Sequence, residues 1–293
     1  MKNIKHLLFL SILCSLVLFT NCGEDEDPVA DDPTNNTNDG SITVLDADGD
    51  GVADADDTCA DTAEGATVNT SGCPVVAESL IYLDENGITI KVSEDAVVGE
   101  SSDLDSISYL VVDSAMLSQM VANEEDVTKV VMSRVSNMTA MFKDAYSFNQ
   151  DISSWDVSSI TNMGSMFYRT PFFNQDLSSW DVSNVTNMSE MFNGYNEVNE
   201  IPQSSFNGDI SSWDVSNVMD MRFMFSGAIS FNQDIGSWDV SNVTDIYGMF
   251  DGAYAFNQDI SYWDVSEVTN CLQLSYEATA WTEPKPNFTN CTE

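Results

Sequence analysis

The sequence predicts an α/β fold: a solenoid of short parallel strands and helical turns, preceded by a flexible segment and a small acidic loop. The prediction depends on three sets of residues that recur with one spacing. The tryptophans of the repeated "WDVS" are Trp155, Trp180, Trp213, Trp238 and Trp263. Their spacings of 25, 33, 25 and 25 residues are shared by the phenylalanines of "FNQD" or "FNGD" and by the methionines of "MF". Self-similarity at a fixed period indicates a stack of repeats.

Within one repeat, the spacing of the apolar residues predicts the elements. The step of two from Trp155 to Val157 is the period of a strand, and the steps of three from Val157 to Met166 suit a helical turn. These side chains fall on one side of the coil, which favours a shared core over a platform for a ligand. We expect the stack over 131–275, with an eight-residue insertion within 193–205 that is either a specific contact or a tolerated loop.

The first 21 residues are typical of a bacterial secretion signal. Lys2 and Lys5 precede the apolar run "LLFLSILCSLVLF", which is too short to span a bilayer stably. The sequence "LFTNC" resembles the lipobox of bacterial lipoproteins, which implies cleavage before Cys22 and acylation of that cysteine; a simple cleaved signal is the alternative. The following "GEDED" resembles an acidic export tag, or merely opens a linker. Together these features predict an outer-membrane lipoprotein that faces the cell exterior and contacts the membrane only through its lipid.

The composition of the remaining chain excludes several classes of function. Residues 22–45 contain almost nothing apolar, which predicts a flexible tether. Once residues 1–21 are removed, 48 acidic and seven basic side chains remain, a formal charge of −41 that argues against nucleic acid and anionic membranes. The single histidine, His6, lies in the signal, so histidine-based catalysis is excluded. Carboxylate-based hydrolysis needs two acids in unlike environments, whereas the repeat provides one environment, so we expect no enzymatic activity.

Residues 46–57, "DADGDGVADADD", have the oxygen spacing of a calcium-binding loop. Gly51 occupies the sixth position, where such a loop turns most sharply, although an aspartate replaces the usual glutamate at the twelfth. The expected Ca²⁺ ligands are Asp46, Asp48, Asp50, the carbonyl of Val52, Asp54 and Asp57. A solvated acidic turn without an ion is the alternative.

Together with Cys59 and "SGCP" at 71–74, this loop resembles a thrombospondin type 3 repeat, which places the calcium segment at 46–74. The resemblance implies calcium held by the aspartates and a disulfide between Cys59 and Cys73. The cysteines that remain if Cys22 is acylated are Cys59, Cys73, Cys271 and Cys291. They allow three pairings in an oxidising compartment, of which the short loops favour Cys59 with Cys73 and Cys271 with Cys291.

The repeat itself resembles the BspA-like leucine-rich-repeat surface proteins, in the variant whose units read close to "FNQDISSWDVSNVTNMSEMF". The resemblance covers about residues 80–275. It implies a right-handed, leucine-rich-repeat-like solenoid that attaches to proteins or cells, such as host or neighbouring-cell surface proteins or matrix. An N-terminal cap is expected over 75–130, with a helix near 114–124, and a C-terminal cap over 276–293 that a Cys271–Cys291 pair would close.

The residue between the inward-pointing Trp and Val of each repeat should point outward. This predicts a file of carboxylates formed by Asp156, Asp181, Asp214, Asp239 and Asp264. At about 4.8 Å on a parallel sheet, neighbours repel by roughly 1 kcal/mol in water, which a cation or a basic partner would relieve. A merely hydrated face is the alternative.

The sequence therefore predicts a non-enzymatic surface protein for adhesion or protein–protein interaction, with a calcium-stiffened stalk. A carbohydrate-binding surface module is the alternative function. That function requires aromatic side chains on the exposed face. The repeat instead places its regular aromatic side chains in the interior.

Overall fold

The computed structural model describes residues 45–59, 61–63, 66–74, 80–196 and 201–292. The chain divides into two compact units, Met1–Val76 and Ala77–Glu293. The predicted signal at 1–21, Cys22 and the tether up to residue 44 lie outside the described residues. Within the described ranges, no helix is both long enough and apolar enough to cross a membrane.

The described part of the first unit consists of turns joined by side-chain hydrogen bonds. The buried hydroxyl of Thr62 donates to the carbonyls of Cys59 and Gly72, at 2.9 and 2.8 Å. A disulfide joins Cys59 to Cys73, and a bridge pairs Val68 with Pro74. This segment has few apolar side chains to bury, so its order depends on cross-links and polar contacts.

The second unit begins with two small sheets and one helix. Strand β1 (Ile81–Leu83) pairs antiparallel with β2 (Ile90–Val92). The other sheet has the order β3-β4-β5, comprising β3 (Ser101–Leu104), β4 (Ile107–Asp113) and β5 (Val130–Arg134). Strands β4 and β5 are parallel and are connected through α1 (Ser114–Ala122), which lies within the range predicted for a helix. The Asp113 carboxylate accepts the Met116 N–H at 2.8 Å and so caps the start of α1.

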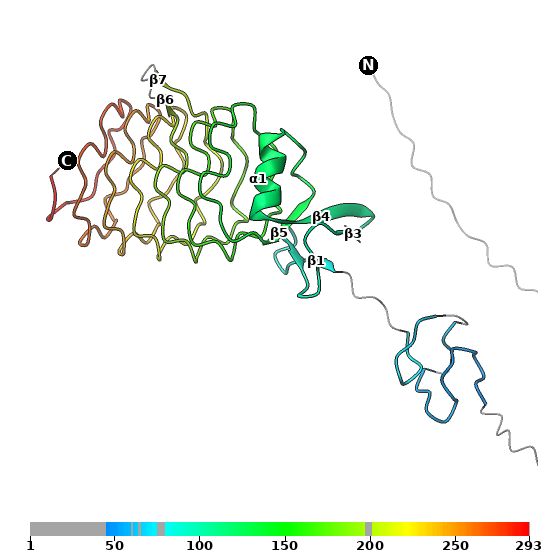
Figure 1. The fold of residues 1–293 in the computed structure, drawn as a ribbon. Helices are drawn as coiled ribbons and strands as arrows, with labels where there is room; N and C mark the ends of the chain where they lie inside the picture. The colour runs from blue at the N-terminus through cyan, green and yellow to red at the C-terminus, as the bar shows by residue number, and fades with distance from the viewer. Residues whose placement is uncertain (1–44, 60, 64–65, 75–79, 197–200, 293) are drawn as a thin grey trace, which may run out of the picture. The chain divides into compact units, whose positions relative to one another are not determined.

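Residues 138–277 form successive coils that lie side by side (Figure 1). N–H groups of one coil donate to carbonyls of the next, as Met163 does to Asn187 at 2.9 Å and Ile246 to Asn270 at 3.0 Å. A row of parallel bridges also joins five coils, at Asn162, Asn187, Asp220, Asp245 and Asn270. Each coil therefore obtains partners for its backbone polar groups both from its neighbours and from turns within itself, such as Met166 N–H to the Met163 carbonyl.

The segment Trp155–Val157 and its copies, where a strand is predicted, lie between two turns. In the described coils these residues form no regular strand, although Trp155 makes one bridge to Ile90. The physical reason is the aspartate between them, whose side chain accepts a backbone N–H two residues later and bends the chain. Parallel pairing occurs instead just before the "MF" segment. The assignment to a right-handed, leucine-rich-repeat-like solenoid stays a prediction.

The interior of the stack contains columns of aromatic rings. Two phenylalanines from each coil form neighbouring columns, and within one coil the rings of Phe225 and Phe231 lie 3.8 Å apart. Tryptophan rings of successive coils stack at 6.4 to 6.5 Å. The indole N–H groups of these four tryptophans donate to carbonyls of an earlier repeat, as Trp180 does to Ile152 at 3.0 Å. Burial of such large rings is the main stabilising contribution that one coil offers the next.

The last residues cover part of the final coil. Trp281 meets the rings of Phe250 and Phe256 edge-on, with centroids 5.3 and 4.8 Å apart. A disulfide joins Cys271 to Cys291. The two small strands β6 (Tyr195–Asn196) and β7 (Ile201–Pro202) pair antiparallel within the insertion.

Candidate functional site

The predicted file of carboxylates is exposed in four coils. Its exposed members, which we call the Trp-Asp row, are Asp181, Asp214, Asp239 and Asp264. In each, Oδ1 accepts the backbone N–H of the serine two residues later, at 3.0 to 3.1 Å. Hydrogen bonds from Ser241 and Ser266 lower the pKa of Asp239 and Asp264, because they stabilise the charged form. The turns thus hold these carboxylates in one orientation.

Asp156 departs from the expectation of an exposed carboxylate, since only 8% of it is accessible. The hydroxyl of Ser133, at the end of the cap in β5, donates to its Oδ2 at 2.8 Å. The hydroxyl of Ser158 donates to its Oδ1 at 2.6 Å. Asp156 lies where the cap meets the first repeat, so the cap covers a position that is open in later coils.

A second row of carboxylates, which the sequence interpretation did not single out, accompanies the first. It contains the exposed aspartates of the "FNQD" and "FNGD" turns, which we call the Asn-turn row: Asp151, Asp176, Asp209, Asp234 and Asp259. Their Oδ1 atoms also accept the N–H two residues later, at 2.9 to 3.1 Å. Hydrogen bonds from Ser211 and Ser261 lower the pKa of Asp209 and Asp259. The signal was present in the sequence, because this aspartate recurs with the same spacing as the tryptophan.

Two further acids stand apart from both rows because they are half-buried. Burial, together with the charge of Glu277, raises the pKa of Asp251 to about 6. One of its oxygens, Oδ1, is buried without a hydrogen-bond partner among the described residues. Burial likewise raises the pKa of Asp220. Asp251 therefore gains a proton in mildly acidic solution.

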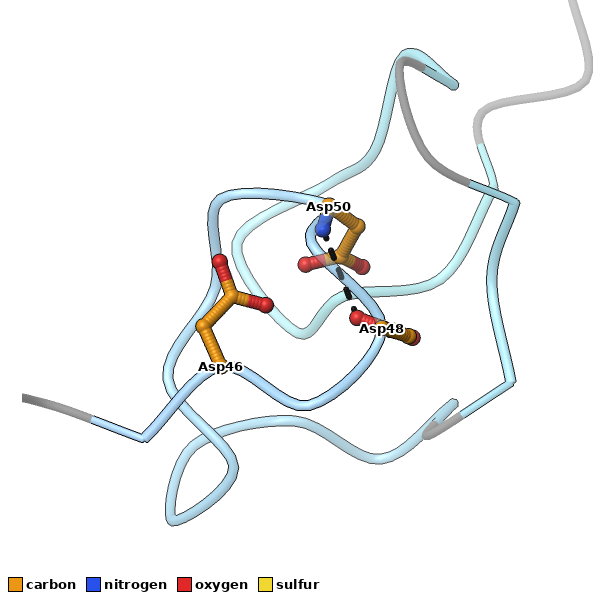
Figure 2. Close-up of side chains that lie close together, drawn as sticks. All are labelled: Asp46, Asp48 and Asp50. Carbon is orange, nitrogen blue, oxygen red and sulfur yellow. Dashed lines mark hydrogen bonds between the residues drawn. The ribbon is translucent and has the colours of Figure 1, made fainter.

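In the calcium segment, Asp46, Asp48 and Asp50 gather around one point (Figure 2). One oxygen from each carboxylate lies within 4.8 Å of the others. Backbone N–H groups of the same loop hold the Asp46 carboxylate in place, because those of Gly49 and Gly51 donate to it at 3.0 and 3.1 Å. Gly51 has a φ of 96°, which confirms the glycine requirement at the sixth position.

The other two predicted carboxylates, Asp54 and Asp57, do not join this group. Asp54 Oδ1 accepts the Ala47 N–H at 2.7 Å, and Asp57 Oδ1 accepts the Cys59 N–H at 2.7 Å. Val52 donates its N–H to Asp50 Oδ1 at 2.8 Å. Hence the described cluster contains three of the five predicted carboxylates.

The donor set of the cluster fits a hard divalent cation. Asp50 Oδ2 is buried and has no hydrogen-bond partner in the described part of the chain, so it is free to bind an ion. Carboxylate oxygens are the ligands that Ca²⁺ prefers. A Cβ at Gly72 would lie 1.9 Å from Asp57 Oδ1 and 3.2 Å from Asp50 Oδ2, so "SGCP" needs its glycine to approach the acidic loop.

The insertion leaves the stack and returns to it without breaking the contacts between coils. The N–H of Gly194 still donates to Ser226 at 2.8 Å, and that of Ser204 donates to Gly227 at 3.1 Å. A Cβ at Gly194 would lie 2.3 Å from the Ser204 nitrogen, so only glycine fits at this junction. Glu197 and Glu200 lie outside the described residues.

A family model described as "Mycoplasma protein of unknown function, DUF285" matches residues 112–203 and 200–288. No curated protein and no solved structure matches the chain. The matched residues run from β4 through the whole series of coils.

Proposed function

The chain belongs to the DUF285 family of unknown function, and we propose that it is a non-enzymatic cell-surface protein whose coils present carboxylates for adhesion or protein–protein interaction. The observation that carries this proposal is the Trp-Asp row. Four copies of one exposed carboxylate are held by the same turn in four coils. Because the turns order these groups in advance, a partner does not bear the full cost of immobilising them.

The chemistry of the surface favours a basic partner. The chain carries 48 acidic and nine basic side chains, so its field attracts positively charged proteins and speeds their encounter. A row that repeats from coil to coil also offers several equivalent contacts to one extended partner, which raises avidity. We therefore propose host or neighbouring-cell surface proteins or matrix as partners.

We also propose a more specific type of solenoid and a cellular location. A BspA-like, leucine-rich-repeat-like solenoid is supported by the "FNQDISSWDVS" unit and by the parallel bridges between coils. An outer-membrane location is supported by the signal-like residues 1–21 and by Cys22 as the lipidated residue.

We further propose that the segment at 46–74 is a thrombospondin type 3-like repeat that binds Ca²⁺. Asp46, Asp48 and Asp50 would hold the ion, with Asp54, Asp57 and the Val52 carbonyl as the remaining predicted ligands. Support comes from the clustered carboxylates and from the free oxygen of Asp50. The bound ion would neutralise mutually repelling charges and so stiffen the stalk.

The test compares two sets of substitutions that remove equal charge from the same coils. In one variant Asp181, Asp214, Asp239 and Asp264 become Asn; in the control Asp176, Asp209, Asp234 and Asp259 become Asn. Asparagine keeps the side-chain oxygen that accepts the turn hydrogen bond, so both variants should fold. We expect the first variant to lose about tenfold or more in binding to matrix-coated surfaces, with a smaller loss in the control.

Equal losses in the two variants would assign binding to net charge alone and contradict a specific role for the Trp-Asp row. Turnover of a polysaccharide by the purified chain would contradict the non-enzymatic proposal.

A further inference from the structure

A cavity of about 480 Å³ lies between the end of α1 and the first coil. Its walls include Glu124 and Glu125 after the helix, and Lys143, Tyr146 and Phe148 from the coil. The volume lies in the range of small-ligand sites, about 300–1,000 Å³. Neither the proposed stalk nor the Trp-Asp row involves these residues, so the cavity calls for a separate explanation.

The cavity exists because a column of rings ends here. In later coils the equivalent phenylalanines (Phe173, Phe206, Phe231 and Phe256) are at most 1% exposed, whereas Phe148 is 8% exposed. The loop after α1 occupies the place of a preceding repeat, since Gln150 donates to the Glu125 carbonyl at 2.9 Å. At the position of that ring, 25 residues before Phe148, the loop has Asn123, which Glu124 and Glu125 follow. The lining of the cavity combines two aromatic side chains, Tyr146 and Phe148, with polar and charged ones.

The walls of the cavity are held in place by hydrogen bonds. The N–H groups of Glu124 and Glu125 donate to the carbonyls of Val121 and Met120, at 3.0 and 2.9 Å. The Ser147 hydroxyl donates to the Glu124 carboxylate at 3.4 Å. Two residues apart in the first coil, the Tyr146 hydroxyl donates to the carboxylate of Asp144, another lining residue, at 3.2 Å. The site is therefore preorganised, which favours binding of a small ligand.

The lining of the cavity carries three carboxylates and one ammonium group, and a neighbouring guanidinium compensates part of the excess negative charge. Arg169 donates from Nε to the Asp144 carboxylate at 2.6 Å, and the Lys143 ammonium lies 4.7 Å from the centre of the Tyr168 ring. Of the three lining carboxylates, Asp144 is thus paired with Arg169, which lies outside the lining, and Lys143 offsets a second charge in a chain whose formal charge is −39. Lys143 and Arg169 would compete with a cationic ligand for these carboxylates. The distribution of charge therefore favours an uncharged ligand.

We propose that this cavity binds a neutral saccharide unit. A sugar ring has a C–H face that packs on an aromatic ring and hydroxyls that both donate and accept hydrogen bonds. Tyr146, 54% exposed, supplies the ring. Glu124 and Glu125 accept from hydroxyls, and Lys143 donates to them. This site goes beyond the proposed protein-binding role of the coils and would add recognition of glycans at one end of the repeat series.

The test uses saturation-transfer NMR on the full chain with the methyl glycosides of glucose, galactose, mannose and N-acetylglucosamine. We expect at least one to bind, with a dissociation constant of roughly a millimolar, as for small polar ligands. Tyr146→Ala and Ala122→Phe should each weaken binding by about tenfold or more. Ala122→Phe fills the cavity from an exposed position without removing a polar group, so it reports on the site even if Tyr146→Ala perturbs folding.

The matched control is Tyr254→Ala, which removes an exposed tyrosine from another coil and should change binding by less than about twofold. The fourfold Asn variant of the Trp-Asp row should also bind the glycoside normally, so the two proposals fail independently. Absence of transfer to all four glycosides would overturn the inference, as would binding that survives Ala122→Phe. Binding of tetralysine that Glu124→Gln abolishes, without glycoside binding, would assign the cavity to a cationic side chain instead.

Discussion

The calcium segment and the repeat coils are both acidic, yet they are held together in different ways. In the calcium segment the carboxylates converge, and order comes from a disulfide, a few polar contacts and the proposed ion. In the coils the carboxylates of the Trp-Asp row and the Asn-turn row are exposed, and the interior is filled by buried aromatic and aliphatic side chains. The same residue, aspartate, therefore forms a converging cluster that we propose as a metal site in the loop, and forms turns in the stacked coils.

The largest effect should come from removing one ring of the stack, which has no counterpart in the calcium segment. Phe192 is 1% exposed and stacks on Phe167, Phe206 and Phe225. We expect Phe192→Ala to lower the free energy of unfolding of the coils by about 3–5 kcal/mol, measured by urea denaturation. The control Phe172→Ala, which removes a ring that is 66% exposed, should cost less than about 0.5 kcal/mol. Similar losses for both would mean that the columns do not stabilise the stack.

A second change should affect only the calcium segment. Asp50→Asn removes a charge from the cluster and should weaken Ca²⁺ binding by about tenfold or more, measured by calorimetry on the full chain. Chelation of Ca²⁺ should speed amide exchange at 45–74 and leave 138–277 unchanged. Asp56→Asn is the matched control, because this exposed aspartate of the same loop falls outside the predicted ligand spacing. If Asp56→Asn weakened binding equally, general acidity rather than coordination would explain the affinity.

The smallest effect on the free energy of unfolding should come from Asp251, the half-buried aspartate that belongs to neither exposed row. Its pKa is raised to about 6, so the folded state holds its proton more tightly than the unfolded state does. The resulting stability is fully present below the unfolded value of about 4 and is lost as the pH rises through about 6. Because the group is only half-buried, solvent screening limits the effect to about 1 kcal/mol.

Asp251→Asn should therefore raise the free energy of unfolding at pH 7 and flatten its pH dependence between about 4 and 6. Denaturation of both proteins across this pH range measures the difference. The control Asp239→Asn, from the Trp-Asp row, should act in the opposite direction, because the pKa of Asp239 is lowered. An unchanged pH dependence in Asp251→Asn would show that another group is responsible.

Much of the molecule could be predicted from spacing alone. The recurrence of tryptophan, phenylalanine and methionine identified the coils, and their side chains are buried in every described copy except Met141, which is partly buried. The range 114–124 contains α1, and the cysteines favoured by short loops are joined in the structure. These features could be predicted because they depend on spacing along the chain. A repeated spacing directly indicates which side chains lie on the same side.

The remaining features depend on residues far apart in the sequence. Asp156 is buried by Ser133 of the cap, 23 residues earlier, although its immediate neighbours match those of exposed copies. The Trp-Val step of two, which predicted a strand, lies between two turns because the aspartate between them captures a backbone N–H. The cavity arises where a helix replaces a repeat. The sequence alone determined the unit and its interior, whereas the tertiary structure decided what covers each end, since packing between distant segments sets exposure.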